Sequence, residues 1–196
     1  MAQVAAGQSL TTNQIAAAIS YGSHYKTKEK FLEKGLRGVR VKLASAMALD
    51  GISKFATFFN DWNGIAAEAA AANQQLKEVK PEDFVPEGLL HAFVEVHASG
   101  AIPASKLNRR YLEGRAHLVL RSGEKTIQPV EKSMLMRSDQ SPASIVLGLP
   151  TGKITLEFAF KVSPADLAQG VEIILIDGDG NQHRAKANLA EALKAQ

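Results

Sequence analysis

Three oxygen-bearing side chains in the stretch IDGDGNQHR, residues 176–184, have the spacing of calcium ligands. Asp177, Asp179 and Asn181 match the first three ligand positions of an EF-hand loop, whose oxygen atoms coordinate a calcium ion. That loop also needs a glycine at its sixth position, a bidentate glutamate at its twelfth and a helix on each side. This chain has Gln182 and Asn188 at those two positions. The pattern therefore excludes an EF-hand.

The residues on both sides of this stretch favour a β-hairpin. Residues 171–176 are rich in β-branched side chains and residues 183–187 alternate with period two, so both predict strands. Between them, Gly178 and Gly180 can adopt positive φ, and Asp and Asn tolerate the left-handed region. We expect a hairpin turn here, with a partial calcium site closed by a neighbouring loop as the alternative.

Three histidines on predicted strands are further candidate metal ligands. His91 and His97 share one face of a strand over residues 88–98, but six residues at ~3.3 Å each place them ~20 Å apart. One of them would need His117 or Glu95 opposite it on a paired strand to hold an ion. These histidines, or the loop at Asp177, form the basis of one hypothesis, a metal-dependent enzyme or metal-stabilised domain.

A basic segment lies between residues 26 and 42, where seven basic residues face only Glu29 and Glu33. The basic residues are Lys26, Lys28, Lys30, Lys34, Arg37, Arg40 and Lys42. Such a segment can bind an anionic polymer or surface, or it can be a solvated helix face with Glu and Lys pairs. Nucleic-acid binding is not expected, because only Tyr25 and Phe31 supply aromatic rings nearby.

The connection over residues 99–114 is long for a β-sandwich, and long loops on a rigid scaffold often carry binding. Its polar cluster consists of Lys106, Asn108, Arg109, Arg110 and Tyr111. We regard this cluster as a candidate binding loop, with a solvated crossover between two sheets as the alternative.

The elements that must position these residues begin with a helical segment, residues 1–37. Thr11 and Gln14 form a capping-box pattern before a helix that we expect to end at Gly22. A second short helix, capped by its threonine, is expected at residues 27–34.

A change of period marks the main domain, residues 38–196. Residues 38–46 alternate between apolar and basic side chains and predict the first strand. One long amphipathic helix is then expected at about residues 60–78, inserted after that strand. It should pack onto the sandwich through Trp62, Ile65, Ala69 and Leu76.

Most of the remaining chain alternates with period two between turn signals. Strands are predicted at residues 88–98, 115–121, 125–131, 143–149, 153–162, 171–177 and 182–189. Together with the first strand, this pattern predicts an α+β chain with an antiparallel, immunoglobulin-like β-sandwich. Pro129 should confine its strand to a sheet edge.

Several chemistries lack support in the sequence. The chain has no cysteine, which removes disulfides and thiolate chemistry and leaves the redox compartment open. Glu157 and Glu172 are expected on exposed outer faces of adjacent strands, where little would raise a carboxyl pKa. No nucleophile elbow, zinc-protease motif or dinucleotide-binding fingerprint is present. We expect no cofactor.

The sequence therefore predicts a non-enzymatic structural or partner-binding module that acts through its surface and long loops. Its partner would be a protein or a component of the cell envelope or extracellular space. The alternatives are the anionic-polymer binder and the metal-dependent domain. The start MAQVAAGQ lacks the basic and apolar regions of a signal peptide and resembles a mature exported protein. A periplasmic or extracellular location is therefore expected, with the cytoplasm as the alternative, and no transmembrane span is predicted.

Overall fold

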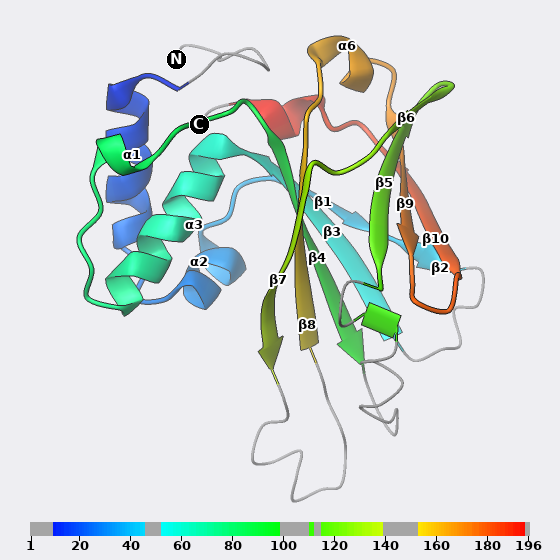
Figure 1. The fold of residues 1–196 in the computed structure, drawn as a ribbon, viewed down its shortest axis with the longest axis horizontal. Coiled ribbons are helices and arrows are strands. Elements are labelled where there is room, and N and C mark those ends of the chain that lie inside the picture. Colours follow the sequence, from blue (N-terminus) through cyan, green and yellow to red (C-terminus); the bar gives the residue numbers. More distant parts are fainter. Residues whose placement is uncertain (1–9, 46–51, 99–109, 112–114, 139–152, 195–196) are drawn as a thin grey trace, which may run out of the picture.

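The computed structural model describes residues 10–45, 52–98, 110–111, 115–138 and 153–194. This part of the chain is an α+β structure in which two antiparallel sheets pack face to face (Figure 1). Sheet A has the order β1 (Val39–Lys42), β3 (Ile52–Asn60), β4 (Leu90–Ala98), β8 (Lys153–Phe160) and β7 (Glu131–Ser138). Sheet B has the order β2 (Ala44–Ser45), β10 (Gln182–Ala187), β9 (Val171–Ile176), β5 (His117–Ser122) and β6 (Lys125–Ile127).

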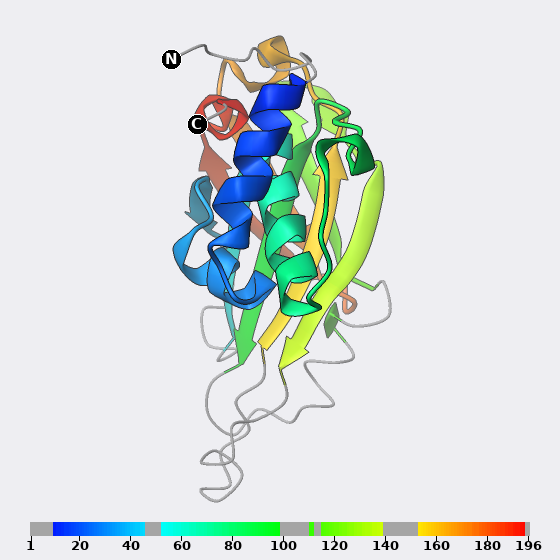
Figure 2. The ribbon, with the colours of Figure 1, turned by 90° about the vertical axis from the view of Figure 1, so that its left-hand side faces the viewer.

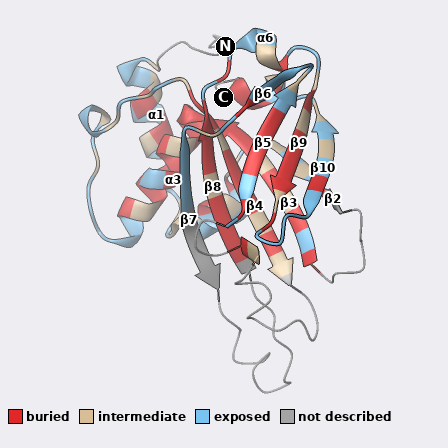
Figure 3. Cartoon of the chain, turned by 45° about the vertical axis from the view of Figure 1, so that its right-hand side comes forward, coloured by how far each residue is buried: buried red, intermediate tan, exposed pale blue. Residues whose placement is uncertain are grey.

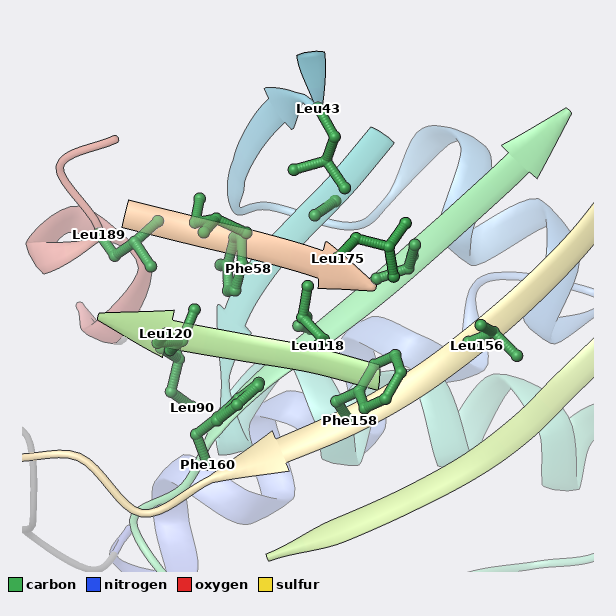
Figure 4. Packing of buried hydrophobic residues seen from close by; sticks show 14 of the residues in the cluster. Leu43, Phe58, Leu90, Leu118, Leu120, Leu156, Phe158, Phe160, Leu175 and Leu189 are labelled. Carbon is green, nitrogen blue, oxygen red and sulfur yellow. The ribbon is translucent and has the colours of Figure 1, made fainter. Parts of the chain in front are cut away.

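The main core lies between the two sheets, because alternate side chains of each strand point inward. Phe58, Leu90 and Phe158 of sheet A belong to one buried cluster with Leu118 and Leu175 of sheet B (Figure 4). Figure 3 shows buried residues along the strands of both sheets. Burying each of these side chains contributes about 1.5–3 kcal/mol.

Three helices cover the outer face of sheet A (Figure 2). They are α1 (Thr12–Ser23), α2 (Lys28–Lys34) and α3 (Asp61–Gln74). α3 contacts β3 and β4, and α1 and α2 pack against α3. A second apolar cluster forms there, and it includes Ile15 of α1, Phe31 of α2 and Trp62 and Ile65 of α3.

Local sequence signals explain how these helices start. The capping box of Thr11 and Gln14 is confirmed, and so is the cap that Thr27 supplies to the amide of Lys30. The prediction for Gly22 was wrong, because Gly22 lies inside α1 and is buried against α3. Its lack of a side chain permits close helix packing, which the sequence pattern cannot distinguish from a helix stop.

The predicted position of the long helix was wrong in one respect, because α3 follows β3 and not the first strand. The pattern missed β3 since Phe58 and Phe59 are both fully buried, one on each face of sheet A. Trp62 packs with the N-terminal helices and not with the sandwich core. Leu76 lies beyond the end of α3, with φ of 55° and 95% of its surface exposed.

The chain passes between the two sheets repeatedly, and two of these crossings are short. β1 pairs with β3 in sheet A, and two residues later β2 pairs with β10 in sheet B, with buried Leu43 between them. The strand predicted at residues 125–131 is instead all of β6 and the first residue of β7, and Pro129 lies where the chain passes between the sheets. The strand predicted at residues 143–149 lies outside the described residues. Short helical turns in the described residues include η1 (Pro81–Asp83), α6 (Pro164–Leu167) and η2 (Ala190–Leu193).

Candidate functional site

A pocket of about 220 Å³ opens between α3, residues 84–89 and the outer face of sheet A. Its polar lining consists of Asp61, Glu68, Glu87, His91, Glu131 and Glu157. Its apolar walls include Ile65, Phe84, Val85 and Leu89. No lysine or arginine is among the described residues that line it. We call it the acidic pocket, since five carboxyl groups and one imidazole share a small, partly apolar space.

Asp61 anchors one side of the acidic pocket. It is the first residue of α3, where Asn60 caps the helix and where the helix dipole favours a carboxylate. Its carboxylate accepts hydrogen bonds from the amides of Gly88 at 2.7 Å and Leu89 at 3.3 Å. It also lies 2.8 Å from Nε2 of His91. Hydrogen bonds to Asp61 therefore hold the segment that leads into β4 against the start of α3.

His91 is held in one orientation by Asp61 and by Phe59. Its ring stacks on Phe59, with centroids 5.5 Å apart and planes inclined by 13°. An ionised Asp61 carboxylate can only accept a hydrogen bond. Nε2 of His91 therefore carries a hydrogen atom and donates the hydrogen bond to Asp61. The other ring nitrogen, Nδ1, has no hydrogen-bond partner among the described residues and lies 3.9 Å from Oε1 of Glu157.

Glu157 lies opposite Asp61 across His91. Burial raises the pKa of its carboxyl group, and the negative charges of Glu68 and Glu131 raise this pKa further, while Lys28 and His91 act in the opposite direction. The sequence placed Glu157 on an exposed face beside Glu172. That prediction was wrong, because β8 and β9 belong to different sheets and the outer face of sheet A is covered by helices.

The stretch at Asp177 forms the turn between β9 and β10, so the hairpin prediction is confirmed. The Asp177 carboxylate is buried and accepts hydrogen bonds from the amides of Asp179 and Asn181, each at 3.0 Å. The side-chain amide of Asn181 donates to the same carboxylate at 3.1 Å. Gly180 has φ of 82°, as expected, whereas Gly178 is not among the described glycines with positive φ.

Arg110 supplies the positive charge beside this turn. Its Nε donates to Oδ2 of Asp179 at 2.7 Å and lies 3.7 Å from Oδ2 of Asp177. The hydrogen bond to Asp179 raises the pKa of the guanidinium. The carbonyl oxygen of Arg110 accepts a hydrogen bond from the amide of Gly178 at 2.8 Å. A guanidinium therefore stands next to the carboxylates that the sequence suggested as calcium ligands.

The other predicted site residues are dispersed. Tyr111 is fully buried in the core between the sheets, and Lys106, Asn108 and Arg109 lie outside the described residues. His91 and His97 lie on β4 in sheet A, whereas His117 lies on β5 in sheet B, so the fold does not bring them together. In the described ranges, no group of three or more His, Asp or Glu side chains is arranged to hold a metal ion.

The basic segment is partly neutralised by ion pairs. Lys28 pairs with Glu68, and Nζ of Lys30 lies 3.8 Å from Oε2 of Glu33. The guanidinium of Arg37 lies 5.2 Å from the ring centroid of Tyr21. A guanidinium nitrogen of Arg40 lies 3.2 Å from Oε2 of Glu95. The remaining members are exposed, and they are Lys26, Lys34 and Lys42. The segment thus does not form one continuous cationic surface.

Comparison with protein-family models and with curated proteins finds no match to this chain. In the part of the chain that the structure describes, no helix combines the length and apolar character needed to cross a membrane.

Proposed function

We propose that this chain is a non-enzymatic binding module on an immunoglobulin-like sandwich, and that it holds a protein partner by taking a basic side chain into the acidic pocket. The observation that carries the proposal is the lining of that pocket. Five carboxyl groups converge on it, none of the described lining residues is a cation, and Lys28 from outside the lining pairs with one of the five, Glu68. A lysine or arginine side chain would supply the missing charge.

The size and walls of the acidic pocket support this choice of ligand. A volume of about 220 Å³ is below the roughly 300 Å³ at which pockets for drug-sized ligands begin. Ile65 and Phe84 can contact the aliphatic stem of a basic side chain, which is the part that prefers apolar surroundings. Val85 lies at the pocket with 83% of its surface exposed, so it can contact the partner around the inserted side chain.

The immunoglobulin-like arrangement supports a binding role by analogy of architecture, because such sandwiches present loops and faces to partners. We extend the proposal to an exported protein, periplasmic or extracellular, whose partner is a protein or a component of the cell envelope. The anionic-polymer hypothesis is less favoured, because Lys28 and Lys30 already have acidic neighbours. The metal hypothesis is less favoured, because a guanidinium stands beside Asp177 and Asp179.

A matched pair of small probes tests the ligand class. n-Butylguanidinium and n-butylurea have nearly the same shape, but only the first is charged. In an NMR titration, n-butylguanidinium should shift the amide resonances of Asp61, His91 and Glu157, and n-butylurea should not.

Removing one carboxylate should weaken the binding of n-butylguanidinium about tenfold, since one charge-assisted hydrogen bond contributes about 1.5–3 kcal/mol. Glu131→Gln is the test variant, and Glu124→Gln, on the exposed turn between β5 and β6, is its matched control. Equal effects of both probes, or equal affinities of the two variants, would contradict the proposal.

A further inference from the structure

Glu157 lies beside the ring nitrogen of His91 that Asp61 does not bind. Both oxygens of Asp61 accept backbone amides, and Oδ1 also accepts Nε2–H of His91, so the Asp61 side of the ring is fixed. The Nδ1 side faces Oε1 of Glu157 at 3.9 Å and has no hydrogen-bond partner among the described residues. A buried polar atom without a partner is unfavourable, so a proton on this side is favoured.

Two arrangements of that proton are equivalent in total charge. A neutral Glu157 can direct its O–H toward Nδ1 of a neutral His91, or a charged imidazolium can face a Glu157 carboxylate. Removing the proton would leave a lone pair facing a carboxylate in a pocket that is already negative. While no other cation is near, Glu157 therefore keeps its proton to a higher pH than an ordinary carboxyl group.

The carboxyl groups around Glu157 favour this state, whereas Lys28 of α2 opposes it. The carboxyl groups are Asp61 and Glu68 of α3, Glu87 of the segment before β4, and Glu131 of β7. Lys28 is engaged by Glu68, so the remaining neighbours are carboxyl groups and His91. Burial raises the pKa of Glu157 in the same sense.

We propose that the acidic pocket exchanges this proton for the cation that it binds, so that binding a basic side chain releases the proton shared by His91 and Glu157. This inference rests on the proposed function, because it needs the same site and the same class of ligand. A guanidinium or ammonium group that enters supplies the positive charge and donates hydrogen bonds to Glu157. The ionised form of Glu157 is then stabilised by the bound cation, and the proton is released to solvent.

Proton exchange makes the affinity depend on pH with a known sign. Release of one proton lowers the Kd of the cation by up to tenfold per pH unit, as long as the shared proton is still bound in the empty pocket. The dependence should extend above the pH at which ordinary carboxyl groups lose their protons, because the pKa of Glu157 is raised by burial. At a pH where the empty pocket has lost the proton, the Kd becomes constant.

The test measures the Kd of n-butylguanidinium by NMR between about pH 5.5 and 8, where exposed Asp and Glu are ionised. The Kd of the wild type should fall as the pH rises, and at the lower pH the side-chain carboxyl ¹³C resonance of Glu157 should move toward its ionised position on saturation. In a variant with both His91→Gln and Glu157→Gln the Kd should be independent of pH, and Glu124→Gln should behave as the wild type.

The outcomes separate the two proposals. Binding with a Kd that does not change with pH, or with no movement of the Glu157 carboxyl resonance, overturns the proton exchange and leaves the binding function standing. Absence of n-butylguanidinium binding at every pH overturns both. If the double variant does not fold, the Glu157 resonance of the wild type alone decides the question.

Discussion

Close packing between α1 and α3 makes Gly22 a sensitive position. A methyl group added at Gly22 would lie 2.7 Å from the carbonyl carbon and 2.9 Å from the Cα of Ala66, and closer still to the carbonyl oxygen. These are backbone atoms, which cannot rotate away as a flexible side chain can. Gly22→Ala therefore requires α1 and α3 to move apart.

Two opposing effects decide the sign of this substitution. Alanine is favoured over glycine within a helix by about 1 kcal/mol, which would stabilise the protein. Overpacking of a close-packed region costs about 1–3 kcal/mol, and the contact with backbone at Ala66 places Gly22→Ala in the upper part of that range. We expect a net loss of about 1–2 kcal/mol in the free energy of unfolding.

Gly64 of α3 provides a matched control. A methyl group added there would have its nearest contact at 3.5 Å, with Nε2 of His91, which is an ordinary van der Waals distance. Gly64→Ala should therefore stabilise the protein by about 0.5–1 kcal/mol. The two glycine-to-alanine changes should have opposite signs.

Urea unfolding, followed by circular dichroism, gives the free energy of unfolding for the wild type and for both variants. In a chain of this size, each kcal/mol moves Tm by about 2–4 °C, so thermal melts provide a second measurement. If Gly22→Ala is as stable as the wild type, or more stable, the close approach of α1 and α3 is not what determines the choice of glycine, and the reasoning is refuted.

Three further predictions concern single side chains. The raised pKa of Glu157 means that the native state holds its proton more tightly than the unfolded state, so stability should fall as the pH rises through that pKa. Glu157→Gln should remove this fall in a series of Tm values against pH, and an unchanged slope would argue against it. Asp166 has its pKa lowered to about 2 by a hydrogen bond from Lys125 and by hydrogen bonds from Ser163. It should stabilise the protein above about pH 4 and lose that effect as the pH falls toward 2, and Asp166→Asn should abolish this part of acid unfolding unless the contact is absent in solution. Trp62→Ala should lower the free energy of unfolding, measured in urea, by about 3–5 kcal/mol, because it leaves a cavity in the apolar cluster between the three helices. A loss below about 1 kcal/mol would contradict that packing.

Short-range features of the fold were predictable from the sequence. The capping box at Thr11, the short helix that follows Thr27 and the turn at Gly180 each depend on residues within a few positions of one another. The alternating strands were also predictable wherever one face is wet. β3 was not, because Phe58 faces the main core while Phe59 lies under the helices, and alternation disappears when both faces are buried.

The acidic pocket depends on contacts between distant positions. Asp61 and His91 are 30 residues apart in the sequence, and the register of β4 with β8 places Glu157 beside Phe93, one row from His91. The pairing of Arg110 with Asp179 spans 69 residues. No local pattern encodes such distances, so the sequence indicated the residue types but not which of them meet.

Because the chain crosses from β1 to β2, the short segment 39–45 supplies an edge strand to each of the two sheets. β1 is one edge strand of sheet A and β2 is one edge strand of sheet B, and both belong to residues 39–45. A truncated chain that began after this segment would expose the hydrogen-bonding groups of β3 and β10 together, in addition to losing α1 and α2. Unpaired strand edges recruit other chains, so such a fragment would be expected to aggregate by adding strands at both sites.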